Sequence, residues 1–243
     1  MIHYHGTPIG GSRQDVARFL MGRHALVPYP RRDDLGVVAE CCKSFVFDNG
    51  AFSVWKRGEK LDVDGYSRWV CEWCCHPGFA WALVPDVIGG SEEENDDFIV
   101  RWCDEGLRKY GVPVWHLHES LERLEKLCYD WPMVALGSSG EWAQPGTAGW
   151  WGRITQAMKV ICDDLGRPRT KLHGLRMLAP DVFTRLPLAS ADSTNAAVNA
   201  GSIKRFGQYL PPSSAQRAAI IAERIESHNS AAIWQHSGQV DLW

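Results

Sequence analysis

The chain has 243 residues, of which 45% are hydrophobic and 23% are charged, and its formal net charge is -3. This is ordinary composition for a soluble globular protein, and the charge excludes a generic nucleic-acid coat protein. The longest apolar runs are short and interrupted by charges, so we expect no transmembrane span. The length suits one α/β barrel or two small domains.

The N-terminal stretch and the cysteines predict a cytoplasmic protein. Residues 1–6 lack the basic and apolar regions of a signal peptide. A chain of this size does not need a disulfide framework, so we expect its eight cysteines to be reduced and mostly buried. Cys71, Cys74 and Cys75 could form half of a zinc site, but no second ligand pair follows at suitable spacing. We therefore predict that they pack in the interior, and we predict no metal and no cofactor.

The first half of the chain alternates short apolar runs with helix-like stretches. Strands are predicted at 2–5, 25–28, 45–47 and 81–84, and helices at 12–22, 34–43, 64–75 and 91–110. Ser12 and Ser91 occupy positions typical of helix caps. The acidic residues after Ser91 favour the positive end of a helix.

The second half repeats the alternation. Strands are predicted at 113–117, 133–136, 172–175 and 188–190, with helices at 119–129, 149–165, 180–185 and 213–228. Strands that alternate with helices indicate a parallel sheet, and eight such units fit a compact (β/α)8 barrel. We predict an α/β fold with one TIM-type barrel domain over residues 1–243 and a C-terminal helix. An open, doubly wound sheet is the alternative.

Polar residues gather after the predicted strands, where the loops of a barrel carry its chemistry. A carboxylate at the mouth of a strand can act as a nucleophile or as a general acid or base. Each could instead cap a turn, but caps would not need to collect on one face of the molecule. We therefore predict a functional site built from Asp48, Asp86, His116, His118, the glycine-rich stretch 137–140 and Asp192.

Basic residues follow the predicted strands as well. A basic face on a mildly acidic protein suits an anionic substrate such as a nucleic-acid strand, although exposed arginines can also be merely solubilising. The basic stretch 166–171 precedes a strand and should lie at the opposite end of the barrel. The candidates for contact with a nucleic-acid backbone are Arg13, Arg31, Arg32, Lys56, Arg57, Lys204 and Arg205, and Arg176 lies in a comparable segment.

The order of these motifs resembles the tRNA-guanine transglycosylase superfamily, including the DNA-acting branch that places 7-deazaguanines in phage and bacterial DNA. The similar region runs from about residue 44 to about residue 200. The residues that carry it are the stretch 48–53, similar to an Asp-Ser-Gly-Gly-Phe-Gln motif; Asp86, at the place of a base-contacting aspartate; the loop 135–141; the stretch 173–176; and Asp192, at the place of the nucleophile. The resemblance implies a (β/α)8 barrel that acts on a nucleobase.

The chain departs from the family at two places. Family enzymes that act on tRNA carry a late zinc site of three cysteines and a histidine, whereas the last cysteine here is Cys162. DNA is therefore the expected partner. His116 or His118 takes the place of a family glutamine, and Ser138 and Ser139 replace smaller residues. The recognised base is left open.

The resemblance implies a reaction at the N-glycosidic bond of a flipped-out nucleotide. Asp192 would attack the sugar C1′ or stabilise an oxocarbenium-like transition state, and Asp48 would be the general acid/base, as in a retaining glycosidase. Water as acceptor gives base excision, which we favour, whereas a free 7-deazaguanine gives base exchange. The setting would be phage DNA modification or defence. Base contacts are predicted from Asp86, His116, His118, Gly137, Ser138, Ser139 and Arg176, and stacking from Phe52, Trp55 or Trp142.

Two other functions compete. His3 and His5 resemble the His-x-His of metal-dependent amidohydrolase barrels and could bind one ion, with His116 or His118 and Asp192 nearby. The sixth strand offers no histidine and the fourth no lysine, and His3 and His5 could simply pack the barrel floor. A non-catalytic nucleic-acid binding module is the second rival, but three rim carboxylates would repel phosphate without benefit.

Overall fold

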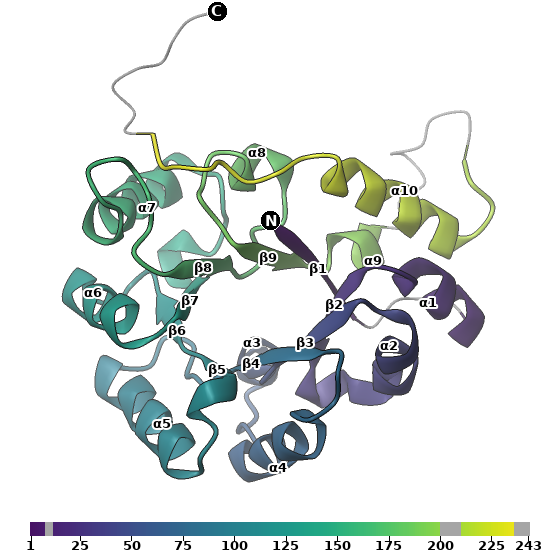
Figure 1. Ribbon diagram of the computed structural model, residues 1–243, viewed down its shortest axis with the longest axis horizontal. Helices are drawn as coiled ribbons and strands as arrows, with labels where there is room; N and C mark the ends of the chain where they lie inside the picture. The colour runs from purple at the N-terminus through teal and green to yellow at the C-terminus, as the bar shows by residue number, and fades with distance from the viewer. Residues whose placement is uncertain (8–11, 200–209, 236–243) are drawn as a thin grey trace, which may run out of the picture.

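A computed structural model describes residues 1–7, 12–199 and 210–235. Parallel strands form a ring, and helices cover its outside (Figure 1). The described strands are β1 (Ile2–Gly6), β2 (His24–Pro28), β3 (Ser44–Asp48), β4 (Phe79–Leu83), β5 (Gly111–Val112), β6 (Val114–His116), β7 (Met133–Gly137), β8 (Lys171–Gly174) and β9 (Ser190–Ser193). The described α-helices are α1 (Arg13–Leu20), α2 (Leu35–Cys41), α3 (Ala51–Lys56), α4 (Val63–Trp73), α5 (Glu92–Asp104), α6 (Leu121–Asp130), α7 (Ala148–Ile161), α8 (Pro180–Phe183), α9 (Asn195–Asn199) and α10 (Ser214–Glu226).

The fifth predicted strand, 113–117, is found as β6, and the two-residue strand β5 that precedes it was not predicted; the ring closes at the break between β5 and β6. The strand order is β5-β4-β3-β2-β1-β9-β8-β7-β6, and Pro113 alone separates β5 from β6. Proline has no N–H to donate to the ladder. The Val84 N–H donates to the Val112 carbonyl at 3.0 Å, and the Ala135 N–H donates to the Pro113 carbonyl at 2.9 Å. The predicted barrel and C-terminal helix are therefore confirmed.

Local chemistry explains where several helices begin. Ser12 and Ser91 each form a capping box with the acidic residue three positions later, as their sequence positions predict. Helix α3 was not predicted, and it begins at Ala51, within the stretch 48–53. Gly50 precedes it with φ of 80°, and a Cβ at this position would lie 2.3 Å from Cδ of Pro30. Only glycine permits this tight turn into α3.

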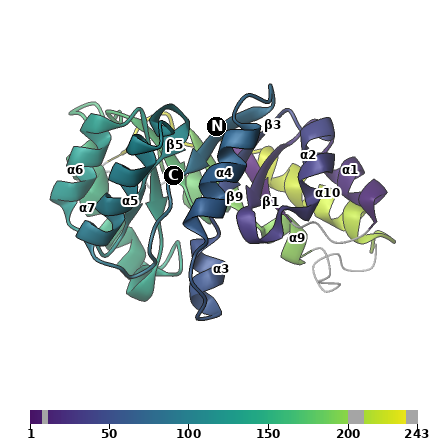
Figure 2. The same ribbon diagram turned by 90° about the horizontal axis from the view of Figure 1, so that it is seen from below.

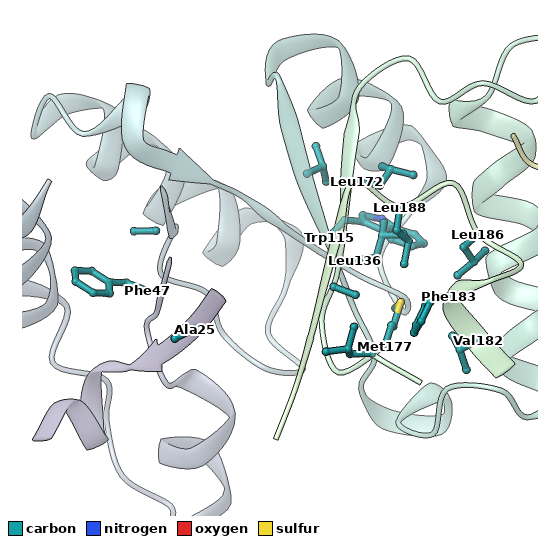
Figure 3. Close-up of a cluster of buried hydrophobic side chains, with 14 of the residues drawn as sticks. Ala25, Phe47, Trp115, Leu136, Leu172, Met177, Val182, Phe183, Leu186 and Leu188 are labelled. Atoms are coloured by element: carbon teal, nitrogen blue, oxygen red, sulfur yellow. The ribbon is translucent and has the colours of Figure 1, made fainter. Parts of the chain in front are cut away.

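Alternation along each strand separates two cores. Outward-facing side chains such as Leu136, Leu172 and Leu188 pack with Phe183 of α8 and other apolar residues in the layer between strands and helices (Figure 3). Inward-facing side chains fill the ring, where Tyr4, Leu26, Val46 and Trp81 form one cluster. The ring is therefore a packed core.

His3 and His5 do not face the barrel interior. His5 Nε2 lies 2.8 Å from Glu226 Oε1 of the C-terminal helix α10, and His3 Nε2 lies 3.0 Å from the His228 carbonyl. Because Tyr4 between them points inward, both histidines point outward. The two interpretations drawn from sequence, an ion site in the barrel and packing of the barrel floor, are both wrong.

The eight cysteines are free, but burial of most of them was a wrong expectation. Only Cys128 and Cys162 are buried, and Cys71 and Cys75 are exposed near the end of α4. The cause is helical periodicity, since α4 buries Tyr66, Trp69 and Val70 and turns the following positions outward. Within the described ranges, no helix has the length and apolar character needed to cross a membrane.

Candidate active site

A small cavity of about 80 Å³ opens at the carboxyl ends of the strands. Three carboxylates reach it from separate parts of the chain: Asp48 from the end of β3, Asp86 after β4, and Asp192 within β9. The sequence placed Asp48 and Asp192 just beyond their strands, whereas both belong to them. The lining residues are Asp48, Asn49, Ala51, Phe52, Leu83, Asp86, Ile88, His116, Gly137, Ser138, Leu175, Arg176 and Asp192.

Asp48 has the chemistry of a proton donor near neutral pH. Burial raises the pKa of its carboxyl group from 3.8 to about 7, and the negative charges of Asp192 and Asp86 add to this rise. The Gly50 N–H, which donates to Asp48 Oδ1 at 2.8 Å, opposes it. A carboxyl group with a pKa near the working pH can both give and take a proton.

Asp192 is buried and held from one side. Its Oδ1 accepts a hydrogen bond from the Arg176 backbone N–H at 3.0 Å and lies 3.3 Å from His173 Nε2. Arg176 has φ of 60°, the only positive value among the non-glycine residues that the structure describes. Such a conformation costs about 1–2 kcal/mol and concentrates at functional sites. Within the described chain Oδ2 of Asp192 receives no hydrogen bond, so it is the oxygen left for a ligand.

Asp86 is tied into a buried polar network. Asn49 Nδ2 donates to Asp86 Oδ1 at 2.7 Å and also to the Val84 carbonyl at 3.0 Å. His116 Nε2 lies 2.8 Å from Asp86 Oδ2. Burial lowers the pKa of His116, but its hydrogen bond to Asp86 and the charge of Asp86 outweigh burial, so the net shift is upward. Each oxygen of Asp86 therefore already accepts one hydrogen bond, and a base could use only the remaining lone pairs.

A second layer of polar groups holds His116 in place. The backbone N–H of His116 donates to Glu119 Oε2 at 2.8 Å. The same carboxylate accepts from Arg123 Nη1 at 2.7 Å, and its other oxygen accepts from Asn95 Nδ2 at 2.8 Å. Sequence reasoning missed this layer, although an acidic and a basic residue four positions apart at a helix start are a recognisable pairing signal.

Ser138 and Gly137 shape the cavity opposite Asp48. Trp150 Nε1 donates to Ser138 Oγ at 2.9 Å, so the Ser138 hydroxyl hydrogen is free to point elsewhere. A Cβ on Gly137 would lie 2.9 Å from His116 Nδ1. A side chain at this strand position would push against His116, which explains why glycine fits there.

Phe52 and Arg176 form the mouth of the cavity. The Arg176 guanidinium carbon lies 4.6 Å from the centre of the Phe52 ring, a cation–π distance. Both side chains are exposed, and Trp55, 57% exposed, lies one helical turn from Phe52 with ring centres 6.0 Å apart. Helix α3 extends beyond the ring of strands on this side (Figure 2).

Several predicted site residues lie elsewhere. Ser139 and His118 are not among the lining residues; Ser139 Oγ is 3.4 Å from His118 Nδ1, and His118 is exposed. The strand ends at His116, and His118 lies in the turn that follows, beyond the buried Leu117. This places His118 outside the cavity. The basic residues Arg13, Arg31, Arg32, Lys56 and Arg57 are exposed and outside the cavity. Lys204 and Arg205 lie outside the described residues.

Sequence reasoning gave no role of their own to Asn49 or to the buried pair His173 and Ser190. Asn49 was quoted only as part of a motif, and its partner Asp86 lies 37 positions away. His173 and Ser190 occupy inward positions on adjacent strands, paired in register. Period-two alternation along the predicted strand 172–175 would have placed His173 inside the barrel, opposite to Leu172, whereas the position of Ser190 follows only from its pairing with His173.

In the described segments, no group of three or more His, Cys, Asp or Glu side chains is arranged to hold an ion. With His3 and His5 on the outer face, the histidine arrangement expected for an amidohydrolase is not assembled.

Comparison with known proteins supports the fold. No protein-family model and no curated protein matches the chain. Among solved structures, a mutant tryptophan synthase alpha-subunit from Pyrococcus furiosus matches with a TM-score of 0.55 and 12% identity, covering 93% of this chain and 97% of the other. A provisionally assigned fructose-1,6-biphosphate aldolase from Coccidioides immitis matches with a TM-score of 0.53 and 12% identity, covering 93% and 90%. The chain thus has the TIM-barrel fold of these proteins, and at this identity the likeness extends to the fold alone.

Proposed function

We propose that the chain is an enzyme that cleaves the N-glycosidic bond of a nucleobase in DNA, with water as acceptor. The observation that carries this proposal is the shared cavity of Asp48 and Asp192, in which Asp48 has a pKa of about 7 and Asp192 keeps one oxygen free. Two carboxyl groups in different environments suit the separate roles of proton donor and nucleophile. The resemblance of the motif order to tRNA-guanine transglycosylases adds support.

The reaction has two steps. First, Asp192 Oδ2 forms a bond to the sugar C1′ while the C1′–N bond breaks, and the bonding electron pair leaves with the base, which takes a proton from Asp48. Second, Asp48 accepts a proton from water, the water oxygen bonds to C1′, and the bond to Asp192 Oδ2 breaks. Both carboxyl groups then return to their starting states, and an abasic site remains.

The mouth must rearrange to admit a base. A cavity of about 80 Å³ is far below the roughly 300–1,000 Å³ of ordinary ligand pockets. Phe52 and Arg176 are the exposed groups at the opening, and they contact each other mainly through a cation–π interaction. Moving them apart would open the cavity to a flipped base and leave the Phe52 ring free to stack on it.

The test is to incubate the protein with unmodified DNA and with 7-deazaguanine-modified phage DNA, each single- and double-stranded. Mass spectrometry then measures the released bases and the abasic product. Excision predicts a free base and an abasic site; exchange predicts that a base is released only when free 7-deazaguanine is added. Asp192→Asn should reduce release by about 10⁴-fold. Full activity in that variant would refute the proposal.

Asp130→Asn is the matched control. Asp130 is an exposed carboxylate at the other end of the barrel, in a groove that does not contact the cavity. Its substitution should leave base release within about twofold of the wild type. A comparable loss in both variants would point to general damage instead of loss of a nucleophile.

A further inference from the structure

Two similar histidine–serine pairs lie inside the barrel, one on each side of Tyr4. His173 Nδ1 of β8 is 2.8 Å from Ser190 Oγ of β9, and His24 Nδ1 of β2 is 2.8 Å from Ser44 Oγ of β3. The Tyr4 ring centre is 6.1 Å from that of His173 and 5.8 Å from that of His24. The pairs therefore offer a comparison within one molecule.

Only the first pair reaches a carboxylate of the cavity. His173 is fully buried, and its Nε2 lies 3.3 Å from Asp192 Oδ1, which is within ion-pair distance, although this nitrogen makes no hydrogen bond in the described chain. His24 has no carboxylate within ion-pair distance among the described residues. The contact with Asp192 is thus the feature that distinguishes His173.

The neighbours of His173 select one tautomer. A neutral imidazole has one N–H and one nitrogen lone pair. A lone pair on Nε2 would face the negative Oδ1 of Asp192 and be repelled, whereas an N–H there would be attracted. Nδ1 then carries the lone pair and accepts the hydroxyl hydrogen of Ser190. In this tautomer Ser190 donates to His173, and the Nε2–H of His173 faces Asp192 Oδ1 at ion-pair distance.

We propose that His173 is a positioning residue for Asp192, a role that rests on the proposed function. The Arg176 backbone N–H donates to Oδ1, and the His173 imidazole lies within ion-pair distance of the same oxygen, which leaves Oδ2 for the cavity. Holding a nucleophile in a reactive orientation lowers the barrier without direct contact with the substrate. After Oδ2 has bonded to C1′, the Arg176 N–H stays on Oδ1 and the His173 Nε2–H stays beside it, and both stabilise the negative charge that returns to Asp192 in the second step.

Nuclear magnetic resonance of the imidazole nitrogens tests the geometry without any substrate. In protein labelled with ¹⁵N-histidine, the His173 signals are assigned by their loss in His173→Asn. We expect a proton on Nε2 and an unprotonated Nδ1 in the wild type. Asp192→Ala should abolish this preference and leave the His24 signals unchanged. A proton on Nδ1 alone in the wild type, or the same tautomer in Asp192→Ala, overturns the proposal.

Base release from the DNA described above tests the role in catalysis. His173→Asn keeps an amide near Ser190 but cannot reach Asp192, and it should lower kcat by about 10²-fold with KM nearly unchanged. His173→Gln can return an N–H to the position of Nε2 and should restore most of kcat. His24→Asn is the control and should behave as the wild type. The unfolding midpoint of every variant is measured alongside.

The two failures are distinct. If Asp192→Asn keeps full activity, the proposed function is wrong, while the tautomer experiment still decides the contact between His173 and Asp192. If Asp192→Asn is inactive but His173→Asn keeps the wild-type kcat, the proposed function stands and the positioning role is overturned.

Discussion

The two ends of the barrel carry hollows of very different volume, and the larger one is not the candidate active site. At the amino ends of β7, β8 and β9 lies an open groove of about 650 Å³, and at the carboxyl ends lies a cavity of about 80 Å³. The groove's charged side chains Asp130, Arg169 and Lys171 are exposed to water. The basic stretch 166–171 reaches this end, as its place before a strand predicts.

The small cavity encloses three carboxyl groups, Asp48, Asp86 and Asp192. Asp86 and Asp192 are each less than a tenth exposed, and the negative charges of both raise the pKa of Asp48. Burying carboxylates together costs free energy unless hydrogen bonds compensate, and such clusters concentrate at functional sites. Enclosed charge, not volume, therefore distinguishes the candidate active site from the groove.

The largest effect that would sharpen this comparison is expected at Asp48. Asp48→Asn removes the proton donor and should lower base release by about 10²- to 10⁴-fold, whereas Asp130→Asn in the groove should change little. In the wild type, activity that needs protonated Asp48 should fall as the pH rises through about 7. A flat rate from pH 6 to pH 9 would exclude this role.

The same residue makes stability depend on pH. The pKa of Asp48 is about 7 in the folded protein and ordinarily 3.8, so the folded state binds this proton more tightly. The resulting stabilisation is fully present below about pH 3.8 and is lost as the pH rises to about 7. The thermal midpoint of Asp48→Asn relative to the wild type should therefore rise between pH 5 and pH 7 and then level off. Calorimetry checks the trend, and a constant difference would contradict it.

A smaller effect is expected at Asp86. Asp86→Asn cannot accept hydrogen bonds from both Asn49 and His116, so one buried donor loses its partner. We expect the free energy of unfolding to fall by about 1–3 kcal/mol in chemical denaturation. Asp96→Asn, which alters the exposed partner of Arg123, should cost less than about 1 kcal/mol. Equal losses would mean that the buried network has no special weight.

The smallest effect is expected at the aromatic helix beside the mouth. Trp55→Ala should weaken binding of single-stranded DNA by about 1–2 kcal/mol if the exposed ring stacks on a base. Tyr129, 91% exposed at the groove end, provides the control, and Tyr129→Ala should leave affinity unchanged. Fluorescence anisotropy measures both. A greater loss from Tyr129→Ala would move the DNA-binding surface to the opposite end.

The sequence predicted the strands well because their signals are local. Each of the eight apolar runs overlaps a strand, although the run 188–190 shares only Ser190 with β9. Asp48, Asp86 and Asp192 were expected on one rim because parallel strands all end there. Hydrogen-bond partners depend on side-chain direction and on residues distant in sequence, so the link of Asn49 to Asp86 was missed. His118 was misplaced because the end of its strand was not known to within two residues.

The contact between Asp86 and His116 lies where the ring of strands is interrupted at Pro113. β5 pairs with β4, and β6 pairs with β7. The backbone hydrogen bonds of this segment therefore go to β4 before Pro113 and to β7 after it. Asp86 follows β4, and His116 ends β6. Their 2.8 Å contact therefore joins the two sides of the break between β5 and β6. A ligand that displaced Asp86 would break this contact between the two sides of the opening.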